Sequence, residues 1–245
     1  MKRNVHIGMS GWSYGDWKNV FYPSGISSKE WLSFYAESFS CTEINSSFYR
    51  LPRKQTVENW ADMVPKHFYF CPKLNRYITH LKKLREPEEP MERFFGVFAP
   101  MLKKMGPVLI QLPPSLSFHE DVAAAFFGLL KNKYSVADFV LEPRHKSWLE
   151  DESIKLLKKY KIGFVVSQSG VGFPYAEYIT SGNIYVRFHG PGKLYASSYT
   201  EEELTYFASL FKKWLKEKHS LWIFFNNTYN GIAIENAKVL EKMLT

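Results

Sequence analysis

The sequence predicts an α/β protein in which a single (β/α)8 TIM barrel spans residues 1–245. Eight short apolar segments alternate with helical patterns along the chain, which is typical of repeated strand–helix units and a parallel sheet. The length of 245 residues suits one barrel of about 250 residues. Several strands also end in polar side chains, as the strands of such barrels do where they form a site.

The first half of the chain contains four strand–helix units. Ser28 is a suitable cap for the first helix, and Pro113 and Pro114 close the fourth strand. Residues 82–90 are charged and contain proline, so we interpret them as a surface loop. The predicted strands are 5–11, 41–45, 67–74 and 108–112, and the predicted helices are 28–39, 53–63, 91–105 and 119–133.

The second half repeats the pattern and includes no second domain. Its one unusually long loop, 170–182, contains Tyr175 and Tyr178. The predicted strands are 138–144, 162–169, 183–189 and 221–225, and the predicted helices are 151–161, 201–218 and 230–244.

Alternation sorts the side chains of three strands into an outer apolar set and an inner polar set. Because a buried arginine is costly without a partner or a ligand, an inward Arg187 is informative. We expect the charged strand ends to converge on one cavity. The inward sets are Cys41, Glu43 and Asn45; Val140, Glu142 and Arg144; and Tyr185, Arg187 and His189.

Charge and composition favour anionic partners. The net charge is +8 and the pI is near 9.2, and such a field attracts phosphate esters or nucleic acid. Many lysines lie in the helical runs 155–161 and 212–218, where a solvated outer face explains them. The aromatic fraction of 17% is explained mainly by packing, although some rings are placed to line a cleft.

The two cysteines and the amino terminus predict a cytoplasmic protein. Cys41 and Cys71 each lie in an apolar strand, so we expect reduced, buried thiols. The stretch M-K-R-N-V-H-I-G-M-S has no apolar segment long enough for a signal peptide, and no run approaches membrane-spanning length. We therefore expect no membrane partner.

Seven motifs, taken in chain order, resemble the YecE-like family, domain of unknown function 72. The resemblance spans essentially the whole chain and implies a cytosolic TIM barrel of bacterial or archaeal type without an established reaction. The family's barrel is similar in general form to xylose-isomerase-like and endonuclease-IV-like barrels. The motifs are S-G-W-S-Y at 10–14, E-I-N-S-S-F-Y-R-L-P at 43–52, T-H-L-K-K-L at 79–84, Q-L-P-P at 111–114, E-P-R-H-K-S-W at 142–148, Y-V-R-F-H-G at 185–190 and F-N-N at 225–227.

Glu43, Glu142 and His189 are the candidate catalytic residues. Two carboxylates suit general acid–base or nucleophilic chemistry, and His189 suits a general base. The alternative is that each glutamate pairs with a neighbouring arginine and holds the barrel mouth together. We expect no cofactor, because the strand ends offer no aspartate for a multi-metal site. A single divalent metal held by Glu43, Glu142 and His189 is the alternative.

The candidate binding residues would form an electropositive, partly aromatic ring at the carboxyl-terminal mouth. Guanidinium groups match phosphate geometry, asparagines suit ligand hydroxyls, and rings stack on a base or sugar. Loop capping and rim packing are the alternatives. The binding candidates are Asn45, Lys73, Arg76, His80, Arg144, His145, Arg187, Asn226, Asn227, Trp12 and Tyr14, with Trp148 and Tyr195 as further rings.

The phosphate would lie near the loop H-G-P-G-K-L-Y after the seventh strand and the helix start at Asn230 and Gly231, where many barrels bind this group. The first hypothesis is therefore an enzyme, a hydrolase or an isomerase, that acts on a small phosphorylated substrate. A nucleic-acid-binding barrel without turnover is the second, and an enzyme acting on unphosphorylated carbohydrate is the third. The sequence identifies neither the substrate nor the oligomeric state.

Overall fold

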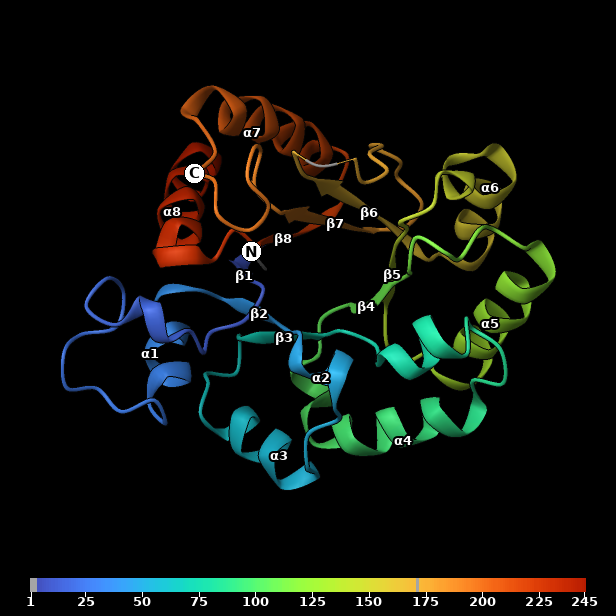
Figure 1. Ribbon diagram of the computed structural model, residues 1–245, viewed down its shortest axis with the longest axis horizontal. Helices are drawn as coiled ribbons and strands as arrows, with labels where there is room; N and C mark the ends of the chain where they lie inside the picture. Colours follow the sequence, from blue (N-terminus) through green and yellow to red (C-terminus); the bar gives the residue numbers. More distant parts are fainter. Residues whose placement is uncertain (1–3, 171) are drawn as a thin grey trace.

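A ring of eight parallel strands surrounded by helices forms the protein (Figure 1), which confirms the predicted barrel. The structure, a computed structural model, describes residues 4–170 and 172–245. Lys2 and Arg3 of the basic amino terminus, and Val171 of the predicted 170–182 loop, lie outside these residues. In the part of the chain that is described, no helix combines the length and apolar character needed to cross a bilayer.

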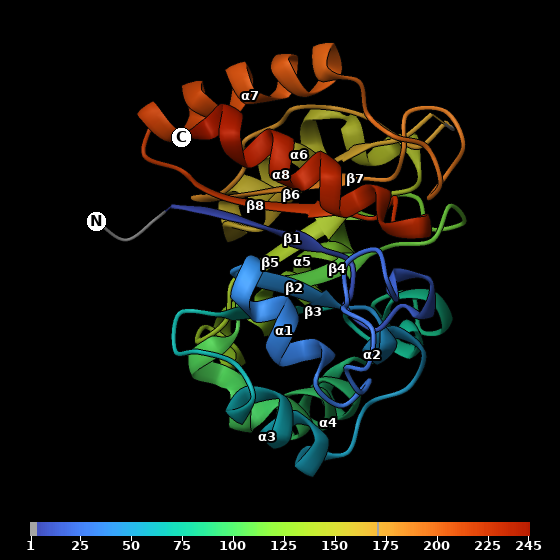
Figure 2. The same ribbon diagram turned by 90° about the vertical axis from the view of Figure 1, so that its left-hand side faces the viewer.

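The strands follow one another around the ring in the order β3-β2-β1-β8-β7-β6-β5-β4. β1 and β8 pair along five positions, so the two ends of the chain are joined within the sheet (Figure 2). The strands are β1 (Val5–Met9), β2 (Cys41–Ile44), β3 (Tyr69–Pro72), β4 (Val108–Gln111), β5 (Phe139–Glu142), β6 (Gly163–Gln168), β7 (Asn183–Phe188) and β8 (Ser220–Phe225).

The ring closes between β3 and β4 through sparse pairing. Two isolated bridges join the strands to each other's flanking residues: Phe70 of β3 pairs with Met105, which precedes β4, and Lys73, which follows β3, pairs with Leu109 of β4. The backbone N–H of Leu74 also donates to the carbonyl of Leu109 at 2.8 Å. Every other neighbouring pair of strands has a regular ladder.

The helices cover the outside of the ring. Figure 2 shows α7 and α8 on one side of the strands and α1, α3 and α4 on the other. The helices are α1 (Trp31–Ser38), α2 (Ser46–Tyr49), α3 (Lys54–Asp62), α4 (Glu88–Phe98), α5 (Glu120–Lys133), α6 (Asp151–Tyr160), α7 (Glu201–Lys216) and α8 (Ile232–Leu244), with the short turns η1 (Gly15–Trp17), η2 (Tyr77–Leu81), η3 (Ala99–Lys104), η4 (Lys146–Leu149) and η5 (Tyr229–Gly231).

Three segments differ from the expected elements. The first helix begins at Trp31 with Glu30 as its N-cap, so Ser28 does not cap it. Proline explains both ends of the fourth helix. α4 begins at Glu88 and includes Pro90 in its first turn, where a helix has no use for the missing N–H. It ends at Phe98 because Pro100 lacks an N–H for the next helical bond, and a 3-10 turn follows. The loop expected after β2 begins with the single helical turn α2.

Two apolar layers separate the outside of the barrel from its interior. The outer layer lies between strands and helices and includes Phe139, Leu141, Ile184 and Val186, as the alternation predicts. Both cysteines are free and buried, which confirms that expectation. The interior layer comprises Cys41, Cys71, Leu109, Val140, Val165, Tyr185, Trp222 and Phe224.

Candidate functional site

Three strands bring Glu43, Glu142 and Arg187 together above the interior apolar layer. Nε and Nη2 of Arg187 donate to the two oxygens of Glu43 at 2.8 and 2.9 Å, and Nη1 donates to Oε2 of Glu142 at 2.8 Å. Both glutamate side chains are 0% exposed and that of Arg187 is 2% exposed. Arg187 therefore joins carboxylates from two strands that are far apart in the sequence. Its contact with Glu43 is the two-bond, forked geometry that guanidinium groups favour.

Further donors surround Glu43. The hydroxyl of Tyr185 donates to Oε1 at 2.8 Å, and Nδ2 of Asn45 donates to Oε2 at 3.1 Å. Nδ2 of Asn45 also donates to the carbonyl of Ser10 at 2.9 Å. The predicted binding residue Asn45 thus fixes the carboxylate and links β1 to β2.

Three groups contact Oε1 of Glu142. Arg144 donates from Nη2 at 2.9 Å, Ser167 donates from Oγ at 2.8 Å, and Nε2 of His189 lies at 3.0 Å. With the Arg187 bond to Oε2, both oxygens of Glu142 are engaged. Each of the four carboxylate oxygens in the cluster therefore accepts at least one hydrogen bond.

The two glutamates are ionised near neutral pH. Burial raises the pKa of each carboxyl group, but the attraction of Arg187 at Glu43, and of Arg144 and Arg187 at Glu142, outweighs burial and leaves both pKa values below the ordinary value of 4.5. In this state the two groups are proton acceptors. The arrangement fits the alternative in which each glutamate pairs with arginine, and a catalytic role for the two glutamates stays a prediction.

His189 is neutral and occupied on both ring nitrogens. Burial lowers its pKa to about 4. Nδ2 of Asn226 lies 3.0 Å from Nδ1, so the network assigns the remaining hydrogen to Nε2, which faces the carboxylate of Glu142. His189 and Asn226 therefore hold each other and the cluster in place.

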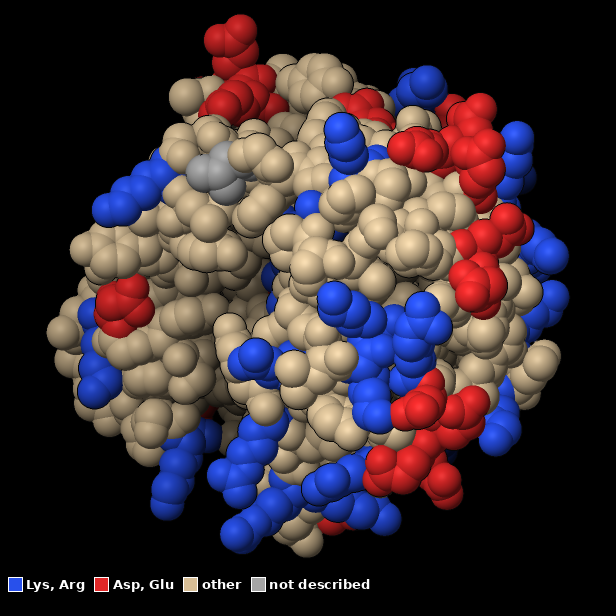
Figure 3. All heavy atoms as spheres, turned by 45° about the vertical axis from the view of Figure 1, so that its right-hand side comes forward, with Lys and Arg blue, Asp and Glu red and all other residues tan. Residues whose placement is uncertain are grey.

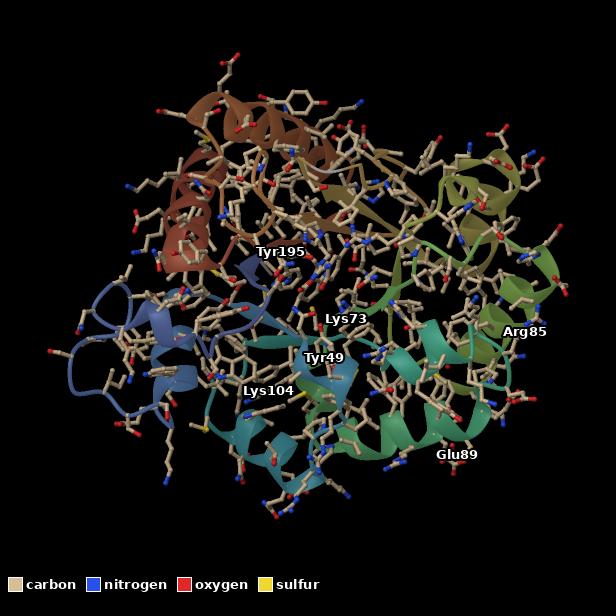
Figure 4. The ribbon with its side chains drawn as sticks, viewed as in Figure 1. Tyr49, Lys73, Arg85, Glu89, Lys104 and Tyr195 are labelled. Carbon is tan, nitrogen blue, oxygen red and sulfur yellow. The ribbon has the colours of Figure 1, made fainter. Side chains whose placement is uncertain are left out.

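Lys73 is the buried amine of the site. Its residue is 8% exposed, and its Nζ donates to Oε1 of Gln111 at 2.6 Å and lies 4.1 Å from the centre of the Phe48 ring. Burial, and then the charge of Arg187, lower its pKa to about 7. Among the described residues, Lys73 forms no ion pair with a carboxylate. Figure 4 shows Lys73 and Tyr195 toward the middle of the ring, with Arg85 and Glu89 at the periphery.

Arg144 has an unused donor. Its side chain is 6% exposed, and the guanidinium lies over the ring of Phe173, 3.5 Å from the ring centre. Nη1 is buried and has no hydrogen-bond partner among the residues that the structure describes. Arg187, also predicted to bind the phosphate, directs its three donor nitrogens to the glutamates, and its contact with a ligand stays a prediction.

Several other predicted residues lie around this cluster. His80 packs edge-on against Phe48, and the charges of Lys73 and Arg76 act on it. Tyr14 donates its hydroxyl to the carbonyl of Ser10 at 2.8 Å. The ring of Tyr195, which is 43% exposed, lies 5.8 Å from that of His189.

Four predicted residues make packing or loop contacts instead. Asn227 donates to Ser197 and Asn236, and His145 pairs with Ser147. Trp148 is buried and donates to the carbonyl of Leu116. Trp12 packs edge-on against Trp60 and Phe70. These contacts match the packing and capping alternatives.

The sequence reasoning assigned no role to five residues that shape the site. Alternation had already placed Tyr185 on the inner face, and it could have identified Gln111 and Ser167 in the same way, because they also stand at inward positions of their strands. Phe48 lies on the one-turn helix α2 and Phe173 lies in a loop. Such short or irregular segments have no sequence periodicity that would predict which way a side chain points.

The cluster does not fit a divalent metal. Across residues 4–170 and 172–245, no three His, Cys, Asp or Glu side chains are grouped so as to hold a metal ion. The guanidinium of Arg187 also bonds both glutamates that a metal would need. The expectation that the protein needs no cofactor stays a prediction.

Fold and site define the class: a TIM-barrel protein with a buried, arginine-bridged glutamate pair at the carboxyl-terminal mouth. Residues 6–245 match the family described as protein of unknown function DUF72. The chain belongs to this family, which confirms the resemblance carried by its seven motifs.

Solved and curated relatives agree with this assignment. A DUF72 family protein from Thermotoga maritima superposes with a TM-score of 0.85 at 30% identity, over 98% of each chain. The Bacillus subtilis UPF0759 protein YunF is 25% identical over 98% of this chain and 94% of its own length. A xylose isomerase domain containing protein from Salmonella typhimurium has a TM-score of 0.59 at 10% identity, over 100% of this chain and 98% of its own, which shows likeness of fold alone.

Proposed function

We propose that the protein binds a small phosphate-bearing ligand at the carboxyl-terminal mouth and acts on it as an enzyme of the phosphoester or sugar-phosphate class. The unpartnered Nη1 of Arg144 carries this proposal. A buried donor without an acceptor costs about 1–3 kcal/mol, and more for a charged group. A phosphate oxygen is an acceptor of matching charge and geometry.

The charges of the cluster also favour an added anion. Arg144 and Arg187 balance Glu43 and Glu142, so a protonated Lys73 leaves the site with one surplus positive charge. Because burial lowers the pKa of Lys73 to about 7, the amine carries this charge in only part of the molecules at pH 7. In this proposal Arg144 and Lys73 contact the ligand, while Arg187 holds the two glutamates.

We expect Arg144→Met to weaken phosphate binding about tenfold or more, because a charge-assisted hydrogen bond contributes about 1.5–3 kcal/mol. Isothermal titration calorimetry with inorganic phosphate and with ribose 5-phosphate measures the change. Arg93→Met on α4, an exposed arginine, is the matched control and should bind like the wild type. Equal affinity in the two variants would contradict the proposed site.

Nucleic acid is the second candidate ligand, and the rim beside the mouth favours it. Tyr49 is 72% exposed, Tyr77 is 45% exposed, and Arg50 and Arg76 beside them are also exposed. The segments that carry them lie side by side, because Nδ2 of Asn75 donates to the carbonyl of Ser47. Figure 3 shows Lys and Arg side chains gathered on part of the surface next to a furrow. Exposed rings between cations suit the stacking of unpaired bases.

Salt dependence separates the two candidates. If the rim binds an extended strand, affinity for a single-stranded oligonucleotide should fall with a log–log slope of about −0.7 per phosphate contacted. Tyr49→Ala should weaken this binding about fivefold or more, because stacking contributes roughly 1–3 kcal/mol per base. Fluorescence anisotropy at several salt concentrations measures both effects. Tyr206→Ala on α7, another exposed tyrosine, is the control.

A further inference from the structure

We propose that Lys73 is a nucleophile that forms an imine with a carbonyl carbon of the ligand. This inference rests on the proposed function and narrows its substrate class to small phosphorylated aldehydes and ketones, including open-chain sugar phosphates. The observations behind it are the hydrogen bonds that occupy the other reactive groups of the mouth, and the placement of the Lys73 amine.

The hydrogen-bond network leaves Lys73 as the strongest nucleophile at the mouth. All four oxygens of Glu43 and Glu142 accept hydrogen bonds, and His189 is engaged at both ring nitrogens. The hydroxyls of Tyr185 and Ser167 donate to those glutamates. Arginine does not lose its proton in proteins.

The two cysteines do not compete with the amine. Cys41 and Cys71 belong to the apolar layer below the cluster, and burial raises the pKa of each thiol. A buried thiol in apolar surroundings is unreactive because the thiolate is the nucleophilic form.

The structure fixes the direction of the Lys73 amine. Nε2 of Gln111 donates to the carbonyl of Leu112 at 3.0 Å, which turns Oε1 toward Nζ of Lys73. The centre of the Phe48 ring lies 4.1 Å from Nζ. One N–H is thus directed at an amide oxygen, and the lone pair of the neutral amine stays available for a carbonyl carbon.

Charged groups from several elements face the amine. Arg187 on β7 and Arg144 after β5 disfavour its protonation, whereas Glu142 and Glu43 favour it. His80 on η2, whose pKa burial lowers to about 4, also interacts electrostatically with Lys73. Burial adds to the effect of the arginines. Burial and these charges together leave a large fraction of the Lys73 amine neutral at pH 7. An ordinary lysine, with a pKa near 10.4, is almost fully protonated at that pH.

The step balances without a further reactant. The nitrogen of Lys73 bonds to the carbonyl carbon, and a proton passes from nitrogen to the carbonyl oxygen, which gives a carbinolamine. The oxygen then leaves with a second proton as water, and the nitrogen–carbon double bond forms. Because Lys73 is buried, the site limits the access of water that would hydrolyse the imine.

Reductive trapping tests the inference on the wild-type protein. The protein is incubated with glyceraldehyde 3-phosphate and sodium cyanoborohydride, and lysine adducts are mapped by peptide mass spectrometry. We expect Lys73 to be modified at least tenfold faster at pH 7 than the exposed Lys212 of α7, with half-maximal reactivity near pH 7. In Lys73→Met that adduct is absent, while Lys212 reacts as before.

Two controls keep this inference distinct from the proposed function. Unphosphorylated glyceraldehyde should modify Lys73 at least tenfold more slowly than its phosphate ester at equal concentration. If the two compounds modify Lys73 at equal rates, and both rates are far above that of Lys212, the result would support the imine and overturn the phosphate site. Phosphate binding by calorimetry together with Lys73 reacting no faster than Lys212 would overturn the imine and leave the phosphate site standing.

Discussion

Arg187→Met is expected to lower the free energy of unfolding by about 3–5 kcal/mol, the usual effect of removing one partner from a buried ion pair. The large effect arises because Glu43 and Glu142, both fully buried, lose the cation that three hydrogen bonds join to them. Arg187→Lys should recover only part of the loss, because an ammonium cannot reproduce the forked contact with two carboxylates.

Urea unfolding as a function of pH measures this effect. In the wild type both carboxyl pKa values lie below the ordinary 4.5, so their stabilisation is present above pH 4.5 and is lost as the pH falls through the folded pKa values. The gap between variant and wild type should therefore narrow on acidification. Adding Glu43→Gln and Glu142→Gln to Arg187→Met should restore part of the stability at pH 7. A loss below 1 kcal/mol at pH 7 would contradict the proposed role.

Lys73→Met is expected to remove a pH dependence of stability between pH 7 and pH 9. The unfolded chain holds a proton on Lys73 up to the ordinary pKa of 10.5, whereas the folded protein releases it near 7. Between these values the unfolded state binds more protons, so this group makes the free energy of unfolding rise with pH. The rise is about 1.4 kcal/mol per pH unit, or roughly 2–3 kcal/mol over the two units.

The difference between the unfolding free energies of wild type and variant, measured at each pH, isolates this contribution. Other titrating groups cancel in that difference. Lys212→Met, on the exposed face of α7, should reproduce the wild-type profile. A wild-type minus Lys73→Met difference that stays flat from pH 7 to pH 9 would mean that the folded protein keeps Lys73 protonated throughout.

Strand periodicity was sufficient to predict the barrel and the convergence of its charged residues. On β7, Tyr185, Arg187 and His189 alternate with apolar neighbours, and the structure places the apolar set in the outer layer and the polar set inside. The same reasoning placed Glu43 and Glu142 at the mouth. A period of two residues determines a face, so it is reliable wherever one side of a strand is buried.

Periodicity could not predict which inward residues bond to one another. Glu43 and Arg187 are 144 positions apart, and the neighbour relations that join them depend on how eight strands close into a ring. The hydrogen bonds that occupy all four oxygens of Glu43 and Glu142 follow from that closure. Trp12 and His145 were predicted to bind a ligand but make packing and loop contacts. Both lie in loops, where no alternation predicts the direction of a side chain and packing decides it.

The sparsest backbone pairing of the barrel, between β3 and β4, lies in the interior of the chain and not where its two ends meet. Lys73 follows β3 and Gln111 ends β4, and a hydrogen bond between their side chains joins the two strands across this gap. If a ligand draws the amine of Lys73 away from Gln111, this hydrogen bond is lost, and we expect ligand binding to be coupled to local opening between β3 and β4.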